Sequence, residues 1–211
     1  EQQDVFTALK NSFATSILQT VVALAVSSIA GYGFEIYHDK AKDSVMSILM
    51  LAMMVPFVAV LVPLFQMFTQ AGLINSWIGF ILPSISTPFL IMYFRTSARS
   101  FPRDTLEAAR IDGLNEFQIF VRMFVPMMRP TYAAAATITF MNAWNAYLWP
   151  KDIMQTNDSI TMPMMVANLM GGYVIDYGVV MAGVTICSLP TVIIFFVLQK
   201  SFTNAVAGAV K

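Results

Sequence analysis

Charged residues divide this chain into long apolar stretches. Four segments contain no Asp, Glu, Lys or Arg: residues 11–34, 44–94, 130–150 and 177–199. A helix needs roughly 20 apolar residues to cross the hydrocarbon core of a bilayer, so the longest segment has room for two helices and each of the others for one. The pattern therefore predicts about five membrane-spanning helices. We place these spans near residues 12–34, 45–68, 77–97, 127–149 and 178–200.

The composition agrees with an all-α integral membrane protein. Hydrophobic residues make up 57% of the 211 residues and charged residues only 11%, whereas about a quarter of a soluble domain is charged. We therefore expect a single membrane domain over residues 1–211, surrounded by the lipid bilayer and without a nucleic-acid partner.

Lys and Arg give the orientation, because positively charged loops stay in the cytoplasm. If the spans alternate, ten of the 12 Lys and Arg residues fall on one side and two on the other. The loop at about 98–125 and the tail at 201–211 are then cytoplasmic, and Glu1 lies outside. A chain that begins outside, and not with Met, is expected to have lost an upstream helix or a signal peptide.

The cytoplasmic loop has the pattern of a helical hairpin. Asp104 stands three residues before Glu107, a spacing typical of a capping box, which predicts a helix from Thr105. Gly113 can adopt the left-handed conformation that ends a helix. Asn115 and the residue three positions later repeat the capping pattern. We therefore expect two short helices joined at a glycine.

The second of these helices has one strongly apolar face. Phe117, Phe120, Val121 and Phe124 follow an i, i+3, i+4, i+7 spacing. Part of this stripe must pack beneath the spans, and any part left exposed would be an apolar patch rimmed by charge, which is typical of a partner-binding surface. From the residues alone, a purely structural hairpin and a docking element both remain possible.

The hairpin resembles a known element. Glu107-Ala108-Ala109, three residues, Gly113 and then Val125-Pro126 resemble the EAA loop of ATP-binding-cassette (ABC) importer permeases, with Met123 and Val125 in place of the usual Ile and Leu. The likeness is strongest to the carbohydrate branch, which includes the smaller permease of the maltose transporter. It extends along nearly the whole chain, through Asn11-Ser12, Pro56, Pro63, residues 72–75, Trp144-Asn145, residues 148–150, Leu189-Pro190 and residues 208–211.

The resemblance implies the type I ABC importer permease fold, with one more helix upstream and with the EAA element as a cytoplasmic coupling helix. In the family this helix seats in a cleft of the ATPase subunit. Glu107 would contact or orient the ATPase, the two alanines would allow close approach and Gly113 would form the turn. An alternative is that Glu107 only caps its helix. The residues assigned to docking are Glu107, Ala108, Ala109, Asp112, Gly113 and Phe117.

The implied function is that of a permease subunit of an ATP-driven importer in a bacterial or archaeal cytoplasmic membrane, forming half of the pathway for a carbohydrate. Its partners would be a second permease, two ATPase subunits and an extracytoplasmic solute-binding protein. The chain has no GxxxxGK[ST] phosphate-binding loop. ATP and Mg are therefore expected on the ATPase, with no cofactor in this chain.

Two other function classes fit the sequence less well. An ion-coupled secondary transporter generally carries ionisable groups within its spans, and the predicted spans contain almost none. An intramembrane enzyme needs a nucleophile with a base, paired acids or a metal cluster. With one His and one Cys, we expect neither catalysis nor a metal site.

Candidate solute contacts lie near the outer end of the fourth predicted span. Amide and aromatic side chains bind neutral, hydroxyl-rich ligands such as sugars. Four such residues cluster here: Asn142, Trp144, Asn145 and Tyr147. An interfacial aromatic belt is an alternative explanation for Tyr147 and for the neighbouring Trp149.

Overall fold

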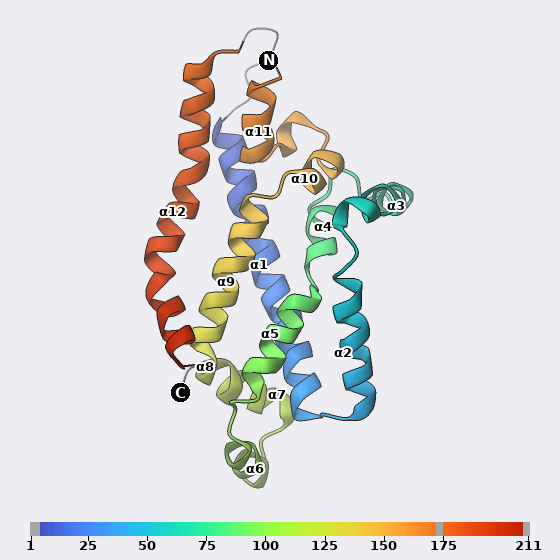
Figure 1. The fold of residues 1–211 in the computed structure, drawn as a ribbon, viewed down its shortest axis with the longest axis vertical. Coiled ribbons are helices and arrows are strands. Elements are labelled where there is room, and N and C mark those ends of the chain that lie inside the picture. The colour runs from blue at the N-terminus through green and yellow to red at the C-terminus, as the bar shows by residue number, and fades with distance from the viewer. Residues whose placement is uncertain (1–4, 172–174, 209–211) are drawn as a thin grey trace. The chain divides into compact units, whose positions relative to one another are not determined.

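The computed structural model describes residues 5–171 and 175–208, and within them the side chains through residue 197. Every regular element in this part of the chain is helical (Figure 1). Three of the elements are not α-helices: η1 and η3 are 3₁₀ turns and η2 is a π-helix. The elements are α1 Val5–Ile36, α2 Lys40–Ala52, α3 Phe57–Gln70, α4 Trp77–Ile81, η1 Leu82–Ser84, α5 Pro88–Ala98, α6 Arg103–Ile111, α7 Glu116–Ile119, η2 Phe120–Phe124, α8 Val125–Met127, α9 Arg129–Trp144, α10 Leu148–Ile153, η3 Asn157–Ser159, α11 Met162–Leu169 and α12 Tyr177–Gly208.

Within the part of the chain that the structure describes, two helices are by themselves long and apolar enough to cross a membrane, namely α1 and the stretch Tyr177–Val197 of α12. Two further spans are possible if α2 with α3, and α4–η1 with α5, each count as one broken helix. Proline stands at both breaks: Pro56 precedes α3, and Pro88 opens α5. Proline removes a backbone donor and ends or bends a helix, so the segments predicted as spans 45–68 and 77–97 are each interrupted.

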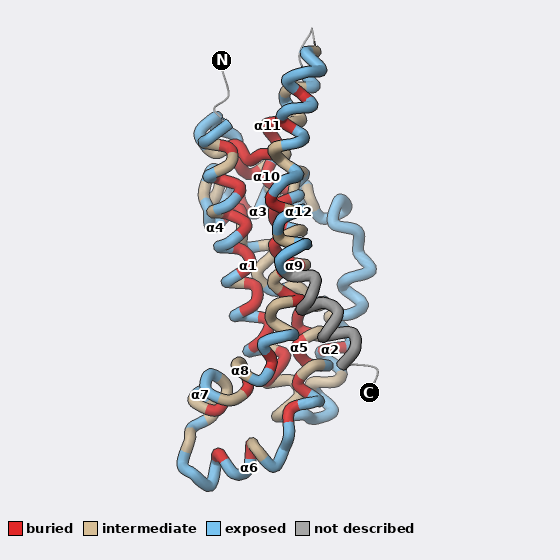
Figure 2. Tube along the Cα trace, turned by 90° about the vertical axis from the view of Figure 1, so that its left-hand side faces the viewer, coloured by how far each residue is buried: buried red, intermediate tan, exposed pale blue. Residues whose placement is uncertain are grey.

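The chain divides into two compact units. The first unit consists of Glu1–Val21, Pro56–Ser84 and Thr137–Gln199, and the second of Val22–Val55, Ile85–Ala136 and Lys200–Lys211. Each unit has its own apolar core, as the buried positions in Figure 2 illustrate.

Buried tryptophan and asparagine side chains hold the first unit together. The indole N–H of Trp149 donates to the backbone carbonyls of Gly79 at 3.0 Å and Phe80 at 3.2 Å. A Cβ on Gly79 would lie 2.2 Å from the Leu73 carbonyl oxygen, so only glycine permits this approach. The amide of Asn11, within α1, donates to the carbonyl of Asp158 at 2.7 Å. The tertiary fold of this unit thus depends on polar contacts as well as on apolar burial.

The second unit is built around a close contact between α1 and α5. A Cβ on Gly31 would lie 2.6 Å from the Phe94 Cβ and 2.7 Å from the Arg95 nitrogen. The buried Arg95 pairs with Glu35 at 3.4 Å and with Asp43 at 2.5 Å. Pairing offsets the cost of burying a charge, so these interactions fix the ends of α1 and α5 from which the hairpin extends.

Candidate functional site

The predicted hairpin is present as α6, a short turn and α7. Gly113 has a φ of +80°, and its N–H donates to the Arg110 carbonyl at 3.1 Å. The next N–H, of Leu114, donates to the Ala109 carbonyl at 3.0 Å. These bonds satisfy carbonyls that the end of a helix leaves free. The prediction that Gly113 ends the first helix is confirmed.

The predicted start of α6 is wrong. The helix begins at Arg103, and Pro102 is its N-cap, with no side-chain cap hydrogen bond. Proline fixes a φ of −64° here in the extended conformation that an N-cap needs. Asp104 therefore lies inside the first turn and not at the cap. Glu107 is then the fifth helical residue, too far along the helix to complete a capping box, so the capping alternative for Glu107 is not supported.

The second helix begins as predicted. Asn115 accepts from the Gln118 N–H at 2.9 Å, and the Gln118 side chain accepts from the Asn115 N–H at 3.0 Å. Across the turn, the Arg110 Nε donates to Glu116 Oε1 at 2.8 Å. This bond and a second one from Tyr37 hold the pKa of Glu116 below its usual range. Local capping and one ion pair therefore fix the angle between α6 and α7.

The apolar stripe is divided between a buried and an exposed half. Phe124 is fully buried and packs edge-on against Tyr32 with ring centroids 4.8 Å apart. Phe120 stacks on Phe124 at 5.5 Å. Phe117 is 72% exposed, and Val121 is also exposed. Phe117 and Val121, four residues apart, lie on one side of the stripe, whereas Phe120 and Phe124 lie on the other side, where both pack against Tyr32.

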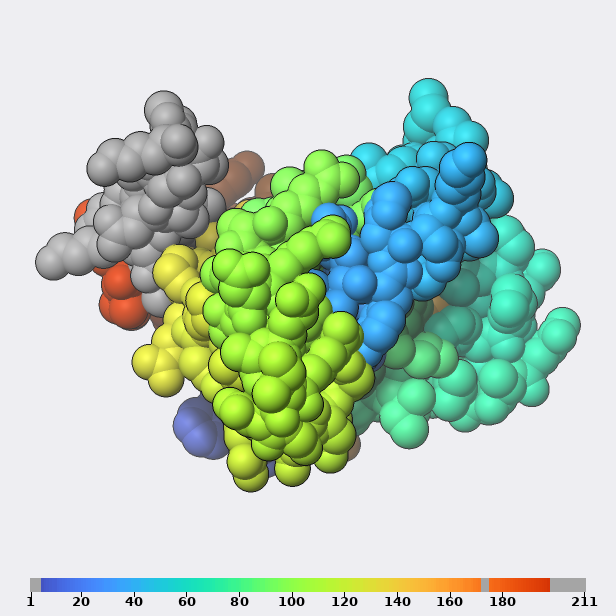
Figure 3. All heavy atoms as spheres, turned by 90° about the horizontal axis from the view of Figure 1, so that it is seen from below, coloured from blue at the N-terminus to red at the C-terminus, as the bar shows by residue number. Residues whose placement is uncertain are grey.

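Ile111 was missed by the sequence analysis. It is the last residue of α6 and is 86% exposed, the largest exposed fraction among the exposed large hydrophobics in the described part of the chain. With Phe117 it stands beside charged residues on both sides of the turn. We call these two side chains the apolar tip. In Figure 3 the yellow-green atoms of this segment face the viewer with nothing in front of them.

The residues assigned to docking take different places in the hairpin. Ala108, Asp112 and Gly113 are exposed. Ala109 is 2% exposed and belongs to the core of the second unit. Glu107 is exposed and lines a crevice of about 160 Å³ between α6 and the ends of α1 and α5. Three guanidinium groups also line that crevice, those of Arg99, Arg103 and Arg110.

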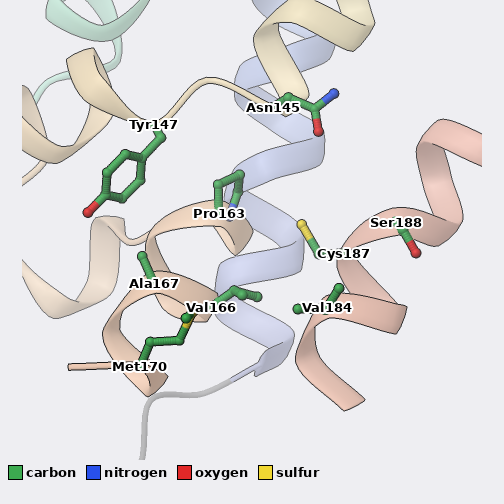
Figure 4. A pocket seen from close by; sticks show the side chains of 9 residues that line it. All are labelled: Asn145, Tyr147, Pro163, Val166, Ala167, Met170, Val184, Cys187 and Ser188. Carbon is green, nitrogen blue, oxygen red and sulfur yellow. The ribbon is translucent and has the colours of Figure 1, made fainter. Parts of the chain in front are cut away.

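The four candidate solute contacts lie in three different environments. Trp144 is buried, donates its indole N–H to the Cys187 carbonyl at 2.9 Å and packs on Phe13. Asn142 is exposed. Asn145 and Tyr147 line a cavity of about 420 Å³ (Figure 4). No group of three His, Cys, Asp or Glu side chains comes together among the residues that the structure describes.

The sequence is similar to those of known transport proteins. A family model described as a binding-protein-dependent transport system inner membrane component matches residues 23–208. The chain is 44% identical over 210 residues to the lactose transport system permease protein LacG of Rhizobium radiobacter, covering 100% of this chain and 77% of that protein. It is 35% identical over 202 residues to the arabinooligosaccharides transport system permease protein AraQ of Bacillus subtilis, covering 95% and 72%.

Two solved structures share the fold. A bacterial ABC transporter involved in the import of the acidic polysaccharide alginate matches with a TM-score of 0.83 at 20% identity, covering 92% of this chain and 74% of that one. The MetNI methionine ABC transporter, in an inward-facing conformation, matches with a TM-score of 0.64 at 19% identity, covering 92% of both chains. Both likenesses extend over the helical architecture and confirm the predicted fold class.

Proposed function

The chain belongs to the family of binding-protein-dependent transport system inner membrane components, and we infer from its hairpin how it is driven. It is a multi-pass permease subunit of an ATP-driven carbohydrate importer in the inner membrane, and not an enzyme. It works with a partner permease, an ATPase and a binding protein. The finer assembly of one further permease, two ATPase subunits and one extracytoplasmic binding protein is our proposal, as is the binding of ATP and Mg by the ATPase.

The transported carbohydrate is proposed to be neutral. The relatives with 44% and 35% identity are named for lactose and for arabinooligosaccharides, and a further relative with 29% identity is named for trehalose. All three names denote uncharged, hydroxyl-rich solutes. Which of these the chain carries is a matter for uptake measurements.

The apolar tip is the observation that carries the docking proposal. Ile111 and Phe117 are largely exposed, while Arg110, Asp112 and Glu116 lie between or beside them. Lipid cannot cover these apolar groups without also burying the charges, which is costly. A folded partner with an apolar cleft rimmed by polar groups can cover both. We assign this cleft to the ATPase subunit.

The buried half of the apolar stripe connects the hairpin to α1 and α5, so it can transmit a displacement of the hairpin to these helices. Phe124 contacts Tyr32 on α1 and, at 5.6 Å, Phe101 beyond the end of α5. When the ATPase subunits close on ATP, the hairpin would move with them as a rigid lever, and this aromatic cluster would pass the displacement to α1 and α5. The permease would then open toward the binding protein, which releases its sugar into the pathway.

The experiment measures retention of the ATPase by the purified permease and ATP-dependent uptake in proteoliposomes. We expect Ile111→Asn combined with Phe117→Asn to lose most of the bound ATPase, by about tenfold or more, because burying each apolar side chain contributes roughly 1.5–3 kcal/mol. Ile111→Leu is the matched control and should retain it. Normal retention and uptake in the double variant would overturn the docking assignment.

Glu107 is tested separately, because it has no capping role. Glu107→Lys should insert normally into the membrane and lose coupled uptake, since a reversed charge beside Arg103 and Arg110 disturbs the crevice and the docking face together. Glu107→Gln, which keeps the size of the side chain, is expected to retain part of the uptake. Unchanged uptake in the lysine variant would remove Glu107 from the docking set.

A further inference from the structure

The cavity beside the end of α9 has walls from three parts of the first unit. Asn145 and Tyr147 come from the connection between α9 and α10, and the side opposite is formed by α11 and α12 (Figure 4). Gly183 lets α12 approach α11 closely, because its Cβ position lies 3.3 Å from Leu169 and 3.5 Å from Val166. The residues that line the cavity are Asn145, Tyr147, Pro163, Val166, Ala167, Met170, Val184, Cys187 and Ser188.

Two polar groups in this lining each use a donor on the backbone. The amide nitrogen of Asn145 donates to the Met141 carbonyl at 2.8 Å, and the Ser188 hydroxyl donates to the Thr185 carbonyl at 2.9 Å. The Asn145 Oδ1 and the lone pairs of the Ser188 oxygen are left as acceptors. Asn145 also has a second amide N–H and Tyr147 a phenol O–H. A ligand with hydroxyl groups, which both donate and accept, can therefore pair with this lining.

The lining also excludes charged ligands. None of the described residues that line the cavity is Asp, Glu, Lys, Arg or His. Lys151, which lies over the Tyr147 ring, is not part of the lining. The lining itself therefore offers no cation to a carboxylate or phosphate and no carboxylate to an ammonium group, and burying either charge there is costly. A neutral molecule that combines hydroxyl donors with apolar faces is the class that remains.

The cavity also has apolar surfaces that suit a sugar ring. The aliphatic side chains of Val166 and Val184 and the ring of Tyr147 offer surfaces on which the C–H face of a sugar ring packs. The Lys151 ammonium lies 5.6 Å from the centroid of the Tyr147 ring, which holds that ring by a cation–π contact. The volume of about 420 Å³ is within the usual range for small-ligand sites.

We propose that this cavity is a contact site for the neutral sugar during its passage, with Asn145 and Ser188 accepting hydrogen bonds from sugar hydroxyls and Tyr147 packing on the ring. The proposal rests on the carbohydrate-importer function above. It adds α11 and α12 to the candidate solute path and removes Trp144 from direct contact. Few available acceptors and no charge make the site weak, which suits a pathway that must release its solute.

Cys187 provides a direct readout, because it is the one cysteine of the chain and lines the cavity. The assembled transporter in nanodiscs is treated with N-ethylmaleimide, and alkylation of this subunit is followed by mass spectrometry. We expect lactose, trehalose or an arabinooligosaccharide to slow alkylation as its concentration rises. Lactobionate, a carboxylate analogue of lactose, should not. Protection by none of the neutral sugars, or equal protection by lactobionate, would overturn the proposal.

An acyl chain of a membrane lipid is the competing occupant. If lipid fills the cavity, alkylation of Cys187 will be insensitive to sugar, and a lipid with a photoreactive acyl chain will cross-link to α11 or α12. That pair of results would reject the sugar site. Sugar-dependent protection without acyl cross-linking at these helices would support it.

Variants separate this site from the docking surface. Asn145→Leu removes the acceptor at similar size and should raise the KM for uptake by about fivefold, the equivalent of one lost hydrogen bond. Ser188→Ala should do so to a lesser extent. Asn168→Leu is the matched control, an exposed amide on α11 outside the lining. ATPase retention should be normal in all three variants. Failure of the docking proposal would instead appear as normal ATPase retention in the double variant of Ile111 and Phe117, and it would leave these KM values unaffected. An unchanged KM in both lining variants would contradict the site.

Discussion

Two surfaces of this protein expose large apolar side chains to a similar degree, and the residues around them differ. On α3, Val58 and Val62 are each 64% exposed, and no charged residue occurs anywhere from residue 44 to residue 94. On the hairpin, Ile111 and Phe117 are exposed to the same or a greater degree, with Arg110, Asp112 and Glu116 among them. The first surface is suited to lipid and the second is not.

The difference shows that exposure in a single membrane subunit has two meanings. An apolar residue in an uncharged segment is solvated by acyl chains and needs no further explanation. An apolar residue between charges can be removed from water only by another protein, since an Asp or Arg at the centre of a bilayer costs about 2.5–3.5 kcal/mol. Charge pattern and exposure together therefore locate the partner surface, where either alone would not.

The largest expected effect separates the two halves of the apolar stripe. Phe124→Ala should destabilise the protein by about 3–5 kcal/mol, because a fully buried phenyl ring is lost. Phe117→Ala should leave stability nearly unchanged and weaken retention of the ATPase. Thermal unfolding in detergent, with ATPase pull-down alongside, measures both. Equal destabilisation by the two substitutions would show that Phe117 is packed within the subunit.

A second pair of variants places the same charged residue, aspartate, on each of the two surfaces. Val58→Asp should reduce insertion into the membrane, because it puts a carboxylate into the uncharged segment 44–94, and a carboxylate costs up to about 2.5–3.5 kcal/mol within the hydrocarbon. Ile111→Asp should insert normally and lose coupled uptake. Membrane-fraction yield and ATP-dependent transport are the measurements. Poor insertion of the Ile111 variant would place the hairpin in lipid and remove the distinction.

A third pair tests the turn of the hairpin with two glycines that both face open space. Gly113 has a positive φ, and Gly33 lies within α1. Gly113→Val should cost about 1–2 kcal/mol, the penalty for a β-carbon in the left-handed region, and should impair coupling. Gly33→Val is the matched control and should be tolerated. If both variants transport sugar at the same rate, the conformation of the turn is irrelevant to coupling.

The smallest effect concerns the ion pair across the turn. Arg110 and Tyr37 lower the pKa of Glu116, so the stabilisation is complete above the unfolded-state pKa and is lost as the pH falls through the folded-state pKa. Both side chains of the Arg110–Glu116 pair are more than 40% exposed, so solvent screens the pair and we expect its contribution to stability to be small. The protection of the hairpin amides against hydrogen exchange, corrected for the intrinsic rate at each pH, should fall as the pH drops through the lowered pKa of Glu116. Glu116→Gln should abolish this change, and a persistent pH response in that variant would assign it to another group.

Local signals in the sequence predicted the hairpin well. The capping box at Asn115 and the turn at Gly113 are set by neighbouring residues, and both are confirmed. Asp104 failed as a cap because Pro102 provides an extended N-cap earlier in the chain. The predicted division of the apolar stripe is confirmed, because Phe120 and Phe124 pack against Tyr32 while Phe117 and Val121 are exposed. The ABC importer permease family was identified correctly from the EAA pattern.

Contacts between distant segments were beyond the reach of sequence patterns. The pairing of Arg95 with Glu35 joins residues 60 positions apart, and the Trp149 bond to Gly79 joins residues 70 positions apart. Trp144 and Tyr147 look alike as interfacial aromatic residues, but one lies in a core and the other lines the cavity. Ser188 gave no signal, because a serine in an apolar helix is common and only its place in the cavity lining gives it a role.

Site-specific cross-linking tests the central claim most directly. With Cys187 replaced by serine, Ile111→Cys and, separately, Val58→Cys are introduced, and the assembled transporter is treated with a short bifunctional thiol-to-amine reagent. We predict a covalent adduct between the Ile111 variant and the ATPase subunit, and none from the Val58 variant. An Ile111 variant that yields no ATPase adduct in the nucleotide-free or the ATP-bound state, or that reacts from the outer face of the membrane, would contradict the account.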